Sequence, residues 1–146
     1  MPYFIDGWVE ATRFDEAERE DRYAWQAVLS VSALVDTADA VSERLFGLSK
    51  DWTPEQGAVA AGRGVPPNPS DELRADLHQI ARHEQKHGPG EFGGLTHASW
   101  HELKAAIPDL DLSASDWRTV FDVVARLEQD ERLNDERLRF IVWYDW

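Results

Sequence analysis

Hydrophobic and polar residues alternate along the N-terminal stretch YFIDGWVEAT, which places Ile5, Val9 and Ala11 on one side of an extended chain. After the polar run FDEAEREDR, the alternation resumes in YAWQAVLSVSALV. A period of two residues is typical of strands with one buried face. The two stretches therefore predict an antiparallel hairpin, 3–12 and 23–35, connected by an acidic loop.

Four later segments carry apolar residues at intervals of three and four, which is the spacing of one helix face. Each begins near a residue that can cap a helix N-terminus, and the first three end at Gly or Pro. In the second segment, Leu73, Leu77 and Ile80 form the apolar stripe. The predicted helices cover 36–47, 70–87, 96–107 and 115–127.

The stretch between the first two helices, 50–69, is rich in glycine and proline and contains GRGVPPNP. We expect an irregular surface connection there, of the kind that often carries functional residues. The chain closes with RLRFIVWYDW, which is apolar on both alternating faces. That pattern predicts a strand in the middle of a sheet.

These elements predict an α+β fold, because two strands, about four helices and a last strand follow one another along the chain. The C-terminal strand is expected to join the N-terminal hairpin in a small antiparallel sheet, with the helices packed on it. A chain of 146 residues has the size of one domain, so we treat 1–146 as a single domain.

Acidic side chains outnumber basic ones by twenty-eight to fifteen, which gives a formal net charge of −13. This charge favours solubility, and it repels phosphate backbones and anionic membranes, so we expect no direct binding to nucleic acid or membranes. It also complements a protein partner with a basic surface. The chain has no cysteine, and we see no signal peptide or apolar run of membrane-spanning length, so we expect a cytoplasmic protein.

One motif with catalytic chemistry lies in the second predicted helix. His83, Glu84 and His87 spell H-E-x-x-H, in which two His one turn apart bind zinc and the Glu takes a proton from the bound water. Helical spacing allows all three side chains to face inward. A zinc-dependent hydrolase with ligands His83 and His87 and general base Glu84 is therefore one hypothesis.

The surrounding sequence departs from the extended zinc motifs. In H-E-x-x-H-x-x-G-x-x-H the third ligand position is held by Gly93, and the only methionine is Met1, so no Met-turn follows. Glu102 is the nearby candidate for a third ligand of the thermolysin kind. The simpler interpretation is a solvated helix end, where His87 complements the negative C-terminal dipole. We therefore expect neither a catalytic residue nor a cofactor, with zinc as the alternative.

Four stretches, SERLFGLSK, GRGVPPNPSDELR, LTHASWHEL and LRFIVWYDW, occur in this order along the chain. Together they resemble a widespread group of small bacteriophage and prophage proteins that have no assigned activity. The matching residues are Arg63, Gly64, Val65, Pro66, Ser70, Glu72, His97, Ser99, Glu102, Leu103, Arg139, Phe140, Trp143 and Asp145. The H-E-x-x-H segment and the ending Asp145-Trp146 depart from that group. The resemblance implies a phage-type accessory protein and no particular chemistry.

Three basic side chains in the matching region suggest a third hypothesis. Arg63, His97 and His101, with Glu102 beside them, could line a pocket between the long loop and the third helix. An Arg and two His suit an anionic small molecule such as a nucleotide signal.

The interpretation that we favour is a non-enzymatic, acidic interaction protein. It would be a phage or prophage accessory factor that engages a host protein with a basic surface. The zinc-dependent hydrolase and the binder of an anionic metabolite are the two alternatives, and the sequence does not determine the oligomeric state.

Overall fold

The computed structural model describes residues 4–48 and 57–145, and they form one antiparallel sheet with helices on both faces. The strand order is β2-β1-β4-β3, with every neighbouring pair antiparallel. The strands are β1 (Phe4–Ala11), β2 (Gln26–Ser30), β3 (Phe92–Ser99) and β4 (Leu138–Asp145). The helices are α1 (Ala40–Phe46), α2 (Asp71–His87), α3 (Trp100–Ala106) and α4 (Trp117–Glu128), with short 3-10 helices η1 (Glu16–Glu20) and η2 (Ile107–Asp109). The predicted α+β class is confirmed.

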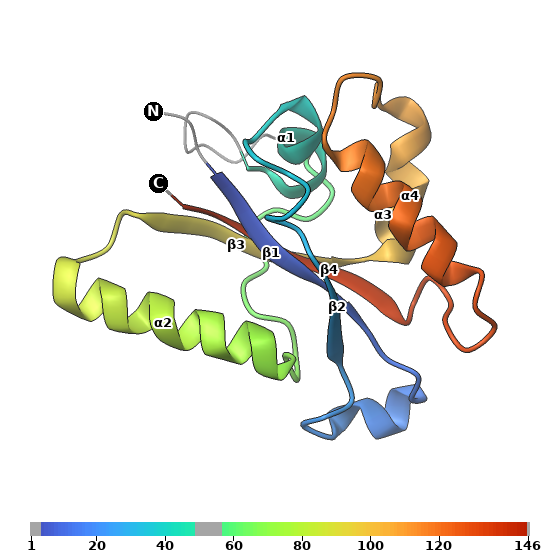
Figure 1. Ribbon diagram of the computed structural model, residues 1–146, viewed down its shortest axis with the longest axis horizontal. Coiled ribbons are helices and arrows are strands. Elements are labelled where there is room, and N and C mark those ends of the chain that lie inside the picture. Colours follow the sequence, from blue (N-terminus) through green and yellow to red (C-terminus); the bar gives the residue numbers. More distant parts are fainter. Residues whose placement is uncertain (1–3, 49–56, 146) are drawn as a thin grey trace.

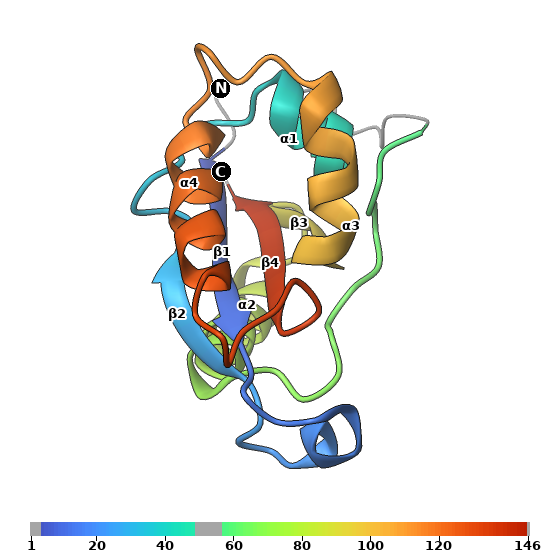
Figure 2. The ribbon, with the colours of Figure 1, turned by 90° about the vertical axis from the view of Figure 1, so that its right-hand side faces the viewer.

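The helices are divided unequally between the two faces of the sheet. Helices α1, α3 and α4 lie on one face, and α2 lies alone on the other (Figures 1 and 2). β4 is central, as its two apolar faces predicted, because it pairs with both β1 and β3. Among the described residues, none of the helices has the length and apolar character needed to span a lipid bilayer.

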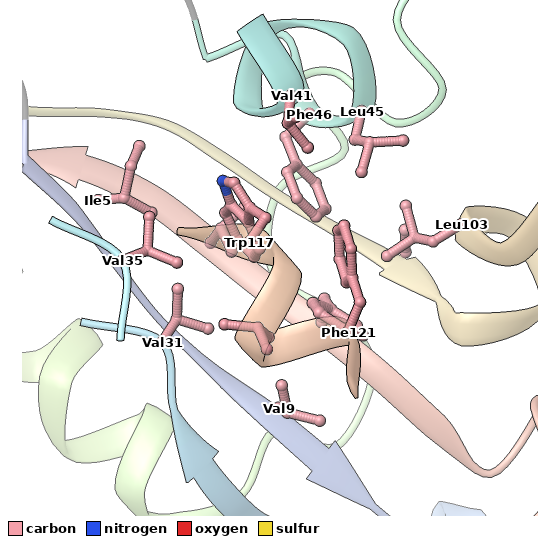
Figure 3. Packing of buried hydrophobic residues seen from close by; sticks show 14 of the residues in the cluster. Ile5, Val9, Val31, Val35, Val41, Leu45, Phe46, Leu103, Trp117 and Phe121 are labelled. Atoms are coloured by element: carbon pink, nitrogen blue, oxygen red, sulfur yellow. The ribbon is translucent and has the colours of Figure 1, made fainter. Parts of the chain in front are cut away.

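The larger core fills the space between the sheet and the three helices. On this face β1 contributes Ile5 and Val9, and Trp117 and Phe121 of α4 pack toward them (Figure 3). The Trp117 ring lies 5.2 Å from that of Phe46 and 5.6 Å from that of Phe121, measured between centroids. Aromatic rings at such distances add specific contacts to the burial of apolar area.

A smaller core lies under α2. The predicted stripe of α2 faces the sheet: Leu73 is fully buried, and Leu77 and Ile80 pack against Ile141 and Trp143 of β4. The two faces of β4 therefore serve two different cores. This explains why a strand with no polar alternation is stable in the centre of the sheet.

The start of α2 is held by a buried ion pair. Arg139 Nε donates to Glu10 Oε1 at 2.7 Å, and both side chains are almost inaccessible to solvent. The same guanidinium donates to the carbonyls of Pro67 and Asn68, and Glu10 accepts from the backbone N–H of Ser70, the N-cap of α2. Two strands thereby fix the loop that leads into α2.

Strand β3 was not predicted, and it corrects the expected third helix. Thr96, at which that helix was expected to begin, lies buried inside β3, and the helix begins only at Trp100 with Ser99 as its N-cap. The segment around Gly93 and Gly94 lacks apolar alternation, and the pairing with β4 shifts register there. Glycine and a bulge together hide a strand from a periodicity argument.

Other boundaries are shorter than expected. β2 covers only 26–30 of the predicted 23–35, because the chain turns after Ser30. α1 covers 40–46 of the predicted 36–47, with Asp39 as its N-cap. The predicted irregular connection is observed from Gly57 onward, and its residues 50–56 lie outside the described part. The described part runs along the outer edge of β3, where the N–H of Gly64 donates to the carbonyl of Leu95.

Candidate functional site

The H-E-x-x-H residues lie on the last turns of α2, close to the start of β3. His83 Nε2 is 2.5 Å from Glu91 Oε2, and the rings of His83 and His87 are 4.6 Å apart between centroids. Within residues 4–48 and 57–145, no three His, Asp or Glu side chains are placed to hold a metal ion together. The described chain therefore does not supply the third ligand that the zinc hypothesis requires.

Arg63 and Glu102 do come together, but as an ion pair. Arg63 Nη2 lies 2.8 Å from Glu102 Oε2, and the guanidinium also donates to the carbonyl of Val59. The hydrogen bond between Arg63 and Glu102 raises the pKa of Arg63 and lowers the pKa of Glu102. Because its charge is neutralised by Glu102, Arg63 is poorly suited to bind an anion.

The two His of the proposed anion site point to different partners. His97 Nδ1 lies 3.0 Å from the Gly64 carbonyl, so this nitrogen carries the proton and fastens the loop to β3. His101 Nδ1 lies 2.9 Å from Asp135, whose hydrogen bond raises the pKa of His101. His101 and Arg63 are thus each paired with a different carboxylate.

A different site is formed between α2 and the sheet. A cavity of about 300 Å³ is lined by Asp6 of β1, Asp76 and His83 of α2, and Asp145 of β4, with further lining from Gln79, Ile80, Phe92 and Trp143. The pairing of β1 with β4 brings Asp6 and Asp145 close together, because Asp6 pairs with Trp143 and Phe4 pairs with Asp145. Asp6 and Asp145 are therefore diagonal neighbours on the α2 face of the sheet.

Within the described part of the chain, the three carboxylates of this acidic cavity, Asp6, Asp76 and Asp145, have no cationic partner. Within the described residues none of them forms a salt bridge, and the lining contains no Lys or Arg. Asp76 Oδ2 accepts a hydrogen bond of 2.7 Å from the indole N–H of Trp8. His83 also reaches the cavity, but it is paired with Glu91.

Ionisation of Asp6 and Asp145 in the acidic cavity is unfavourable. Burial raises the pKa of Asp6, and the nearby charge of Asp76 raises it further. Burial also raises the pKa of Asp145, with a contribution from the charge of Asp6. A cation in the cavity would relieve this repulsion, so the site is electrostatically prepared for one.

Trp143 adds a buried donor without an acceptor. Its side chain is only 2% exposed, and among the described residues its indole Nε1 has no hydrogen-bond partner. The same side chain lines the acidic cavity. A buried polar group without a partner costs about 1–3 kcal/mol, so the position of Trp143 is held by the packing around its ring and not by a hydrogen bond within the described chain.

An apolar cavity adjoins the acidic one. It measures about 120 Å³ and shares Ile80, Phe92 and Trp143 with its neighbour. Its remaining lining is Leu77, Glu84, Gly93 and Leu95. Glu84 of the H-E-x-x-H motif therefore lies beside an apolar hollow and not opposite a metal site. Together the two cavities form a site with one acidic and one apolar end.

Two further hollows lie around β2. One of about 250 Å³ has Arg13 and Arg132 in its lining, and Arg132 is paired with Asp130. The other, of about 220 Å³, is lined in part by Arg22 and Asp71, which pair with each other. Within the described residues, neither hollow is lined by several carboxylates without a cationic partner, as the acidic cavity is.

No sequence pattern brings Asp6, Asp76 and Asp145 together. One signal was available: Arg139 and Asp145 are the charged residues in a C-terminal strand that is otherwise apolar or aromatic. A charged residue in a buried strand requires a partner, or else it marks a site. Arg139 has its partner in Glu10, and Asp145 lies in the cavity.

Comparison with known proteins does not add to this picture, because no family model, curated protein or solved structure matches the chain. The function has to be inferred from the residues and their arrangement.

Proposed function

We propose that the chain is a non-enzymatic interaction protein that engages a basic partner protein through the acidic cavity beside α2. The observation that carries this proposal is the set of three carboxylates, Asp6, Asp76 and Asp145, which surround the cavity without a cation within the described chain. Placing a partner's positive charge there removes the mutual repulsion of these groups.

The overall charge supports the same function. A net charge of −13 attracts a basic surface over a distance and speeds the encounter, while the cavity selects the group that binds closely. In keeping with the resemblance to phage and prophage proteins, we propose that the partner is a host protein and that the association occurs in the cytoplasm. The natural competitors of the chain would then be the anionic ligands of that partner.

A site-specific photo-cross-linking experiment tests the proposal. Gln79 is exposed and lines the acidic cavity, so a benzophenone amino acid at this position should cross-link the partner in cells that naturally make the protein. The same group at Asp122, which is exposed on α4 across the sheet, is the matched control. The captured protein is then purified, and its affinity is measured at increasing salt.

We expect capture from position 79 and not from position 122, a basic partner surface, and an affinity that falls as the salt concentration rises. Equal capture from both positions, an acidic partner, or an affinity independent of salt would each contradict the proposal. So would the failure to capture any protein at position 79.

A further inference from the structure

The acidic cavity has properties that restrict what kind of cation it accepts. Its volume of about 300 Å³ lies at the small end of ligand sites, which range over about 300–1,000 Å³. Its carboxylates come from three different elements, and among the described residues no three such groups are placed to coordinate one metal ion. A cation that fits must therefore be extended enough to reach several separated oxygens.

A guanidinium group meets this requirement better than an ammonium group. It is planar, presents five N–H donors in fixed directions and is weakly hydrated, whereas an ammonium is a compact, strongly hydrated point charge. Phe92 and Trp143 line the same cavity, and guanidinium groups stack on aromatic rings. Elsewhere in this chain Arg139 lies 3.9 Å from the centroid of the Trp25 ring while it bonds to Glu10.

The neighbouring features indicate what is attached to the cation. The apolar cavity shares Ile80, Phe92 and Trp143 with the acidic one, so a ligand that fills both carries an apolar group next to its positive charge. A peptide supplies both parts in a short length, because neighbouring residues carry the positive charge and the apolar group.

Resting on the proposed function, we propose that this composite site binds a segment of the basic partner in which an arginine stands next to an apolar residue. The guanidinium lies among Asp6, Asp76 and Asp145, and the apolar side chain fills the hollow beside Leu77 and Leu95.

Short peptides test this site without knowledge of the partner. The probe is the acetylated and amidated peptide Gly-Arg-Leu-Gly, and the readout is the indole N–H resonance of Trp143 in ¹⁵N-labelled protein. This resonance is assigned through its contacts with Ile80 and Phe92. The comparison peptides replace Arg by Lys, Arg by Gln, or Leu by Ser, and spermidine serves as a cation without a peptide backbone.

We expect Gly-Arg-Leu-Gly to shift the Trp143 resonance in a saturable manner. The Gln peptide should bind at least tenfold more weakly, and the Lys and Ser peptides and spermidine should each bind several-fold more weakly. Asp6→Asn, which keeps an oxygen to accept from the Gly7 N–H, and Asp145→Asn should each weaken binding several-fold. Asp122→Asn on α4 makes the same charge change outside the site and should leave binding unchanged.

Several results would overturn this inference: an unmoved Trp143 resonance, equal binding of the Arg and Gln peptides, equal binding of spermidine, or equal effects of Asp145→Asn and Asp122→Asn. These outcomes are distinct from failure of the proposed function. If position 79 captures a basic partner whose affinity falls with salt but the peptides do not bind, the arginine site is contradicted and the proposed function is not. If the peptides bind but position 79 captures no basic partner, the proposed function is contradicted and the arginine site is not.

Discussion

The buried pair of Glu10 and Arg139 should be the most sensitive polar contact of the fold. Arg139→Met removes a hydrogen bond to Glu10 and two hydrogen bonds to the carbonyls of Pro67 and Asn68, and it leaves the Glu10 carboxylate buried without its cation. Breaking a buried ion pair from one side costs about 3–5 kcal/mol. The unfolding entropy of a chain of 146 residues is about 0.3 kcal/mol per kelvin, so the expected loss of Tm is about 10–15 °C.

The measurement is thermal and urea unfolding followed by tryptophan fluorescence and near-ultraviolet circular dichroism. Arg132→Met removes an arginine from the exposed pair with Asp130 and is the matched control, for which we expect no measurable change. The double variant Glu10→Leu, Arg139→Met should be more stable than the sum of the single losses predicts, because no charge is left buried alone. It does not recover fully, since the N–H of Ser70 still loses its acceptor.

Two results would refute this account of the ion pair. One is a loss below about 1 kcal/mol for Arg139→Met, which would mean that water or another group replaces the guanidinium. The other is simple additivity in the double variant, which would show that the two side chains act independently.

The remaining predictions concern a glycine and a carboxylate. Gly94 and Gly62 have nearly the same backbone angle, φ of +70° and +65°, but a Cβ at Gly94 would lie 2.5 Å from side-chain atoms of Leu48 and Tyr144, whereas a Cβ at Gly62 meets nothing within 4 Å. Gly94→Ala should therefore destabilise by about 1–3 kcal/mol more than Gly62→Ala in urea unfolding, and equal losses would contradict the close packing. For Asp6, burial and the nearby charge of Asp76 raise the folded-state pKa, so ionisation destabilises the fold at neutral pH. Asp6→Asn should unfold at higher urea than the parent protein at pH 7. This advantage should vanish as the pH falls below the ordinary Asp pKa of about 4, and a difference that persists in acid would be inconsistent with the raised pKa.

The sequence anticipated the parts of the fold whose pattern is local. The stripe of Leu73, Leu77 and Ile80 predicted the buried face of α2, and the doubly apolar C-terminal stretch predicted the central position of β4. The start of the third helix was placed wrongly at Thr96, although Ser99 and Glu102, three residues apart, have the spacing of a capping box. Strand β3 was missed because Gly93 and Gly94 interrupt any alternation, and a strand is then recognised only by its partner.

The candidate site depended on long-range register, which a single sequence does not reveal. Asp6 and Asp145 come from opposite ends of the chain, and only the pairing of β1 with β4 makes them neighbours. With twenty-eight acidic residues, no local rule selects these two and Asp76. The residues chosen by motif, His83 and Arg63, instead have carboxylate partners of their own, Glu91 and Glu102. Spacing along the chain identifies residue types that are able to react, but it does not identify their partners.

The loop along β3 also determines how this protein can assemble with itself. The Gly64 N–H donates to the Leu95 carbonyl and the Thr96 hydroxyl donates to the Ala60 carbonyl, so the loop covers the middle of the outer edge of β3, whereas β2 is short and has Val28 exposed on the opposite edge. Sheets that present two free edges can add copies without limit and grow into fibrils. A sheet with one free edge can join only one other copy in this way, which closes the contact as a symmetric pair. Removing the hydroxyl of Thr96 would therefore affect more than local stability. It would weaken the attachment of the loop to β3 and expose a second sheet edge to which further copies could add.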